Sequence, residues 1–175
     1  MTSAQPEPWL RGALPGIPAL LQPAAHALMM AREDVTAAVA NLTPDEVWAR
    51  PGGAASVGYH VAHLSGSTDR LLTYARGAAL DATQKAALIR ESRLADERPS
   101  IESLVAAWHA TVDRALAQLA ATPEAALTEA RAVGKAQLPS TICGLLFHAA
   151  EHASRHAGQV VTTARVVRGA GPDAA

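Results

Sequence analysis

Long stretches in which apolar residues recur at helical spacing alternate along the chain with short stretches rich in proline and glycine. Residues three and four positions apart lie on one face of a helix, so each long stretch predicts a helix with one buried face. One such stretch carries Ile101, Leu104, Val105, Trp108, Val112, Leu116 and Leu119. We expect long helices over residues 18–39, 54–76, 100–121 and 139–167.

Residues between these stretches carry signals that begin and end helices. Thr43 followed by Glu46 forms a capping-box pattern, which predicts a short helix before the second long one. Ser100 is the expected N-cap of the third long helix, and Gly77 is the expected residue just past the end of the second. Pro23 falls inside the first predicted helix, where it should kink the helix or delay its start.

The connections and the two ends complete the expected organisation. Residues 81–93 predict a shorter helix or helical crossover, whereas residues 125–138 are ambiguous because Gly134 argues against a continuous helix. Residues 1–16 should form an extended lead-in, with Trp9 and Leu10 pinning it to the body, and residues 169–175 a flexible tail. The prediction is one all-α domain over residues 1–175, a four-helix bundle with a long connection between helices two and three.

Composition narrows the class of protein. The 175 residues are 49% hydrophobic and 18% charged with a net charge of -1, which favours a packed core and gives no electrostatic drive toward nucleic acid. The single cysteine excludes an intramolecular disulfide framework and suits a reducing compartment. No apolar run reaches the roughly 20 residues of a membrane span, and the N-terminus lacks the pattern of a secretory signal. We expect a soluble cytoplasmic protein without a membrane or nucleic-acid partner.

The histidines are the candidate metal-binding residues. At about 100° per residue, His152 and His156 project about 40° apart on one helix face, in the inward series Ile142, Leu145, Ala149, His152, His156, Val160 and Thr163. Two histidines at this spacing can converge on one metal ion. The alternative, histidines that are individually satisfied or lie at the surface, stays open for the pair taken alone.

A polar stripe on the second long helix favours the metal-binding interpretation of these histidines over the alternative. Ser56, His60, His63, Ser67, Arg70 and Tyr74 share one face, and an apolar stripe borders them. Such a pair of stripes makes sense if the polar one lines a pocket inside the bundle. One histidine from this helix with two from the fourth gives a three-histidine site, which leaves coordination positions open for water or substrate.

These residues resemble a known family. His63-Leu64, together with His152-Ala-Ser-Arg-His156-Ala-Gly-Gln159, is similar to the "His-Leu" and "His-x-x-x-His-x-Gly-Gln" motifs of the DinB-like superfamily of metal-dependent enzymes. The resemblance implies an up-down-down-up bundle, a divalent ion (zinc or nickel) on His63, His152 and His156, and a homodimer. Related members transfer thiol cofactors such as bacillithiol or mycothiol, or isomerise small acids. Ala157 departs from the family, which often has arginine there.

Other residues near the motifs are candidates for roles besides metal binding. Arg70 and Tyr74 extend the polar stripe and are candidate cofactor-binding residues, with Arg70 holding a carboxylate; an arginine paired with a neighbouring acid is the alternative. His60 and His148 either line the pocket behind the ligands or lie at the surface.

Two further residues on the fourth helix are assigned away from the metal. Glu151 should form a surface ion pair with Arg155, four residues on. Cys143 projects about 180° away from His152 and is expected to be a packing residue.

The leading functional hypothesis is a metal-dependent enzyme acting on a small-molecule substrate, with transfer of a low-molecular-weight thiol to an electrophile as its reaction. One alternative is a hydrolase that activates water. The other, from a different class, is a non-catalytic metal- or ligand-binding protein associated with stress. Three ligands favour an open site over a closed structural one, but the sequence shows no clear general base beside the ion.

Overall fold

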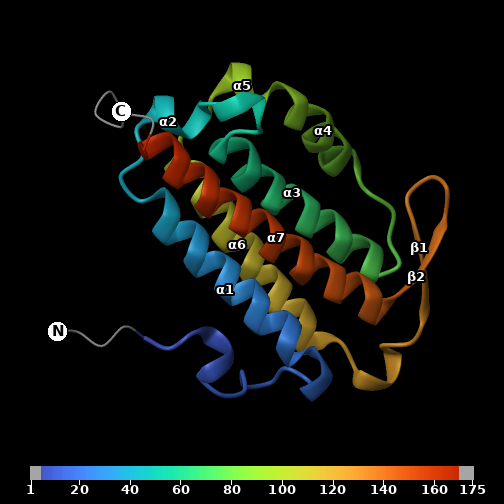
Figure 1. Ribbon diagram of the computed structural model, residues 1–175. Helices are drawn as coiled ribbons and strands as arrows, with labels where there is room; N and C mark the ends of the chain where they lie inside the picture. Colours follow the sequence, from blue (N-terminus) through green and yellow to red (C-terminus); the bar gives the residue numbers. More distant parts are fainter. Residues whose placement is uncertain (1–4, 170–175) are drawn as a thin grey trace.

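Four long helices form a bundle in the computed structural model, which describes residues 5–169 (Figure 1). They are α1 (Gln22–Val39), α3 (Val57–Ala75), α6 (Ile101–Ala121) and α7 (Ile142–Gly169). Both α1 and α3 pack against α6 and α7. Figure 1 shows that α3 and α6 run in one direction and α1 and α7 in the other. The expected all-α, up-down-down-up four-helix bundle is therefore confirmed.

The long connection between α3 and α6 is helical, as predicted. It contains α4 (Ala82–Arg90), a 3-10 turn at Glu91–Arg93 and α5 (Leu94–Glu97). Asp81 begins α4 with a capping box in which Gln84 is the third helical residue. Figure 1 shows this connection returning along the outside of α3, from the end of α3 toward its start.

Local signals set most helix ends. Thr43 and Glu46 form the predicted capping box of α2 (Pro44–Trp48), which a 3-10 turn at Pro51–Gly53 follows. The hydroxyl of Ser100 caps α6 as expected. Gly77 has a φ of 74° and closes α3, because its N–H donates to the carbonyl of Tyr74 in a left-handed turn that favours glycine.

The start of the first helix differs from the prediction. Residues Ala19–Leu21 form a 3-10 turn, and α1 begins only at Gln22, with Pro23 in its first turn. Proline is tolerated there because the first N–H groups of a helix have no intrahelical partner. Pro23 thus delays the helix, and the expected α-helical start at Pro18 is wrong.

The ambiguous segment before α7 is a small hairpin. After a 3-10 turn at Glu124–Ala126, β1 (Ala130–Val133) pairs antiparallel with β2 (Leu138–Thr141), with Val133 opposite Leu138. Pro139 and Ser140, the predicted start of the fourth helix, lie in β2 instead. The helix begins at Ile142 because the hydroxyl of Thr141 accepts the N–H of Gly144, which makes Thr141 the effective cap.

The N-terminal lead-in is held by polar contacts. A 3-10 turn spans Pro8–Leu10, but Trp9 and Leu10 are 57% and 58% exposed, so the expectation that they pin the lead-in is wrong. The guanidinium of Arg11 instead pairs with the carboxylate of Glu33 on α1. Of the predicted tail, Gly169 is the last residue of α7, and residues 170–175 lie outside the described residues.

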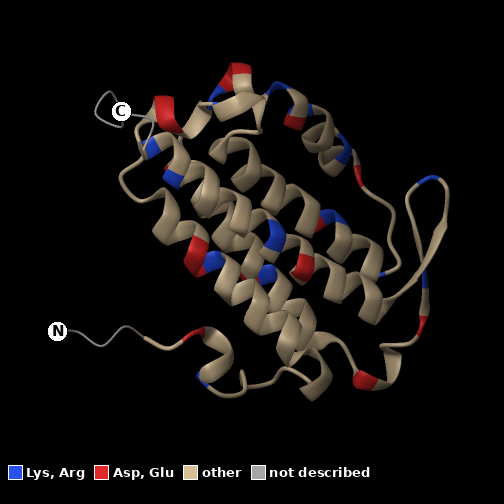
Figure 2. Cartoon of the chain, viewed as in Figure 1, with Lys and Arg blue, Asp and Glu red and all other residues tan. Residues whose placement is uncertain are grey.

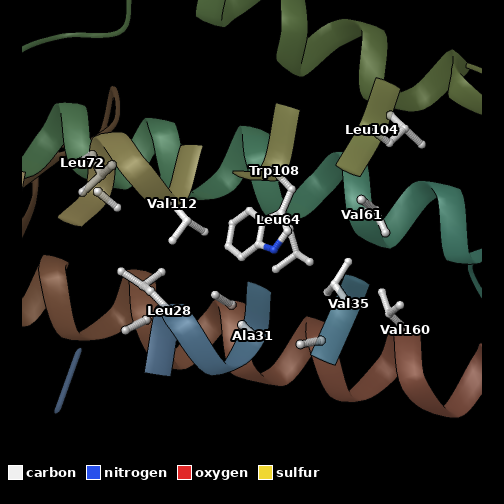
Figure 3. Close-up of a cluster of buried hydrophobic side chains, with 14 of the residues drawn as sticks. Leu28, Ala31, Val35, Val61, Leu64, Leu72, Leu104, Trp108, Val112 and Val160 are labelled. Carbon is white, nitrogen blue, oxygen red and sulfur yellow. The ribbon is translucent and has the colours of Figure 1, made fainter. Parts of the chain in front are cut away.

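The apolar core centres on Trp108 of α6, which is completely buried. Figure 3 shows its ring among side chains from α1, α3 and α6, with Val160 of α7 nearby. Each buried aliphatic side chain contributes about 1.5–3 kcal/mol, so this cluster is the main source of stability. Charged residues of both signs are interspersed along the chain (Figure 2). None of the described helices has the length and apolar character needed to cross a membrane.

Candidate metal centre

The antiparallel packing of α3 on α7 brings three predicted ligands together. His63 from α3 lies against His152 and His156 from consecutive turns of α7, and one nitrogen from each ring lies within 4.8 Å of the others. All three side chains are partly buried. Among the described residues, this is the group of histidine, cysteine and acidic side chains with the geometry to hold an ion.

The distances between ring nitrogens fit a divalent ion. Nε2 of His63 lies 3.1 Å from Nε2 of His152. Two nitrogens bound tetrahedrally at 2.0–2.1 Å from one ion are about 3.3 Å apart, so these rings need little movement to share a metal. Three imidazoles, two of them with Nε2 atoms at this spacing, therefore fit a metal ion.

The protonation of the cluster also suits metal binding. Burial, followed by the neighbouring imidazoles, lowers the pKa of His156 from 6.5 to about 4. Burial and the proximity of His63 lower the pKa of His152 as well. Both rings are thus neutral near pH 7, and neutral imidazole is the form that binds metal.

His60 and His148 take different positions around this cluster. His60 is buried, and its Nδ1 lies 3.0 Å from Nδ1 of His156, so it contacts a candidate ligand directly. Burial, together with the charge of His63, lowers the pKa of His60. His148 is exposed and lies 3.3 Å from the carboxylate of Glu151. Of the two alternatives for each, the structure places His60 in contact with the candidate ligand His156 and His148 at the surface.

A carboxylate that the sequence analysis did not single out completes the surroundings of His63. Oε2 of Glu91 lies 2.9 Å from Nδ1 of His63, and Oε1 accepts a hydrogen bond of 2.5 Å from Arg70. Burial raises the pKa of Glu91, but hydrogen bonds from His63 and Arg70 outweigh it, so the pKa is lowered and the group is ionised. Glu91 follows α4 in the crossover, and no spacing in the sequence relates it to His63.

Comparison with known proteins agrees with this geometry. The sequence model of the DinB superfamily matches residues 27–160. The chain belongs to the DinB superfamily. No curated protein matches it. The matched span of this DinB-superfamily chain includes all three clustered histidines, most of α1 and most of α7.

The other predicted residues of this DinB-superfamily chain lie apart from the three-histidine cluster. Arg70 is bound to Glu91, the arrangement given above as the alternative to cofactor binding, and Tyr74 packs partly buried against the hydrophobic core. Their assignment as cofactor-binding residues stays a prediction. Glu151 pairs with Arg155 as expected. Cys143 is exposed, so its prediction as a packing residue is wrong. It lies about 180° around α7 from His152, which faces α3, and so points away from the bundle.

A cavity opens beside the cluster at the end where α3 begins. It has a volume of about 400 Å³, and its lining includes His60, Gly158 and Gln159 with Thr162 and Thr163 of the same helix. Tyr59 stacks on the ring of His63, with centroids 5.7 Å apart and planes within 8°. The stacked ring limits the orientations of His63, and the cavity gives room for a small molecule next to His60.

Proposed function

We propose that this DinB-superfamily protein is a metal-dependent enzyme whose His63, His152 and His156 hold one divalent ion, zinc or nickel. The observation that carries the proposal is the convergence of three imidazoles, one ligand nitrogen from each within 4.8 Å of the others. Three protein ligands leave coordination positions for a substrate or water, as in catalytic zinc sites, whereas structural sites are usually closed by four.

Electrostatics favours an anionic ligand at this centre. The three imidazoles are neutral donors and do not offset the charge of a divalent ion. The nearest carboxylate, Glu91, is already paired with Arg70, so that pair adds little net charge. A small molecule with a thiolate or carboxylate group is the ligand class that this balance attracts.

The reaction we favour is transfer of a small thiol to an electrophilic substrate. A divalent ion supplies the charge that lowers the pKa of a thiol or water and so produces the nucleophile near neutral pH. The new bond joins the thiol sulfur to the electrophilic carbon, and the thiol proton leaves with the displaced group. Cys143 is exposed on another part of α7, so the chain offers no thiol of its own beside the histidines.

The chain's own residues position the reactants. His60, Gln159 and Thr163 line the cavity beside the cluster and present hydrogen-bonding groups to a bound molecule. Tyr59 covers one face of His63 and holds that ring in place. A hydrolase that activates water at the same centre is the second candidate, and a non-catalytic metal- or ligand-binding protein is the third.

Metal analysis and spectroscopy test these candidates in order. We expect the purified protein to bind about one equivalent of metal. In the cobalt-substituted protein, a low-molecular-weight thiol should produce a sulfur-to-cobalt charge-transfer band. A spectrum that responds to azide or imidazole but to no thiol would contradict thiol transfer and favour water activation. Spectral changes with every ligand but no turnover of electrophiles or esters would favour the non-catalytic candidate.

The proposal extends to assembly and location. The protein would act in the cytoplasm as a homodimer, with close helix contacts through faces rich in alanine. Sedimentation at high concentration should give twice the mass of the 18.1 kDa chain. A single monomeric species across the concentration range would contradict the dimer without affecting the metal proposal.

A further inference from the structure

The carboxylate of Glu91 lies on the side of the His63 ring opposite the metal cluster. Nε2 of His63 faces His152, whereas Nδ1 lies 2.9 Å from Oε2 of Glu91. The two nitrogens point away from each other across the five-membered ring. Glu91 therefore cannot bind the same ion as Nε2, but it can accept the proton on Nδ1. A hydrogen bond there leaves Nε2 as the lone-pair nitrogen that a metal needs.

Two residues of α3 hold Glu91 in this position. The guanidinium of Arg70 donates a hydrogen bond of 2.5 Å to Oε1 of Glu91. The side chain of Arg70 is 11% exposed and that of Glu91 is 13% exposed. Gly66 lies beneath the pair, since a Cβ at this residue would lie 2.5 Å from Oε1 of Glu91 and 2.8 Å from a guanidinium nitrogen of Arg70. Gly66 has no positive φ, so close approach of the ion pair is what requires glycine here.

We propose that Glu91 is the positioning residue of the metal centre. It fixes the His63 tautomer and ring orientation, while Arg70 and the space at Gly66 fix Glu91 itself. The inference rests on the metal site proposed above and adds a residue from the crossover between α3 and α6 to it. On this view Arg70 anchors the carboxylate rather than binding a cofactor.

Metal affinity measured by competition with a chromophoric chelator tests the proposal on the full-length protein. Removing a carboxylate that supports a histidine ligand weakens metal binding by about 10–100-fold, and we expect this loss for Glu91→Ala. Glu91→Gln keeps one acceptor oxygen and should lose less. Glu91 also lines a cavity of about 500 Å³, so water can replace the missing side chain and keep the loss within this range.

A matched control separates positioning from simple loss of negative charge. Glu151 is an acidic residue adjacent in sequence to His152, but its carboxylate contacts Arg155 and His148 instead of a clustered histidine. Glu151→Ala removes the same charge close to the site, and we expect unchanged metal affinity. Equal weakening by Glu151→Ala and Glu91→Ala would overturn the positioning role.

Gly66→Ala tests the same contact without altering either charged residue. Alanine is favoured over glycine inside a helix, so α3 should keep its stability, but the new Cβ displaces the Glu91–Arg70 pair. We expect weaker metal binding with unchanged helical circular dichroism. Wild-type affinity in both Gly66→Ala and Glu91→Ala would overturn the proposal.

Nitrogen-15 spectra of the histidine rings report the tautomer directly, which a merely structural role would not change. In the zinc-loaded protein, Nδ1 of His63 should carry a proton hydrogen-bonded to Glu91. In Glu91→Ala the chemical shift of this N–H should move to that of a water-bonded group, since zinc on Nε2 keeps Nδ1 protonated. A zinc-loaded protein in which Nε2 of His63 carries the proton would overturn the inference while leaving metal binding intact. If the unaltered protein bound no metal at all, both the proposed function and this inference would fail.

Discussion

The two faces of α3 illustrate two ways in which one helix serves the molecule. One face carries Val61 and Leu64, which are completely buried against the core around Trp108 (Figure 3). The other face carries His60 and His63, which meet the histidines of α7. The apolar face gains stability from burial alone. The histidine face instead places polar rings in the partly buried three-histidine cluster, where burial contributes less stability but the rings offer ligands to an ion.

The largest loss of stability is expected for a substitution in the core that the apolar face of α3 packs against. Trp108→Ala removes a completely buried ring and should lower the free energy of unfolding by about 3–5 kcal/mol, as large-to-small core substitutions do. Urea unfolding followed by circular dichroism measures it. Trp9→Ala is the matched control, because Trp9 is 57% exposed and its loss should change the free energy by less than about 0.5 kcal/mol.

Substitution in the three-histidine cluster, where the histidine face of α3 meets α7, should affect metal binding more than stability. His152→Ala removes a candidate ligand, so stoichiometric metal binding is expected to be lost, as it should be for His63→Ala and His156→Ala. The free energy of unfolding of the metal-free protein should change by no more than about 1 kcal/mol, because lost packing and removal of an unpaired nitrogen oppose each other. Metal content and urea unfolding of each variant provide the measurements.

A control for these variants is His109→Ala, since His109 contacts Thr36 on α1 and lies outside the cluster. It should keep full metal content. Full stoichiometric metal in all three variants of the cluster would mean that the two faces of α3 do not differ in function.

The free energy of unfolding of the metal-free protein should depend on pH through the three-histidine cluster, whereas the apolar face of α3 has no titratable group. The pKa of His156 is lowered from 6.5 to about 4 on folding. The unfolded state therefore binds more protons, and the free energy of unfolding should fall as the pH drops from about 6.5 toward 4. Urea unfolding across this range should show the decrease, and His156→Ala should flatten it. An equally steep decrease in that variant would assign the effect to other groups.

The smallest effect is expected at His148, which lies on α7 one turn before the three-histidine cluster. His148→Ala removes an exposed ring that contacts Glu151, so the free energy of unfolding should change by less than about 0.5 kcal/mol and metal content should stay complete. His60→Ala should also leave most of the metal in place, because His60 contacts His156 from outside the ligand group. Loss of metal in the His148 variant would extend the site beyond the three histidines.

Features that depend on local geometry could be predicted from the amino-acid sequence alone. Helical periodicity predicted four long helices, and the Thr43–Glu46 capping box predicted α2. The spacing of His152 and His156 placed both rings on the inward face of one helix, because residues four apart lie one turn above each other. The local signals failed at Pro139 and Ser140, where hairpin pairing with β1 outweighs their tendency to begin a helix.

Only the tertiary structure decided which distant side chains meet. The polar stripe contains both His60 and His63. The packing of α3 against α7 brings His63 into the three-histidine cluster and places His60 in contact with His156. Glu91 is 28 residues from His63, and its approach depends on the path of the crossover along α3. No helical period relates two residues across such a connection. Contacts of this kind are fixed by the packing of whole elements, so they follow from the folded chain and not from its local pattern.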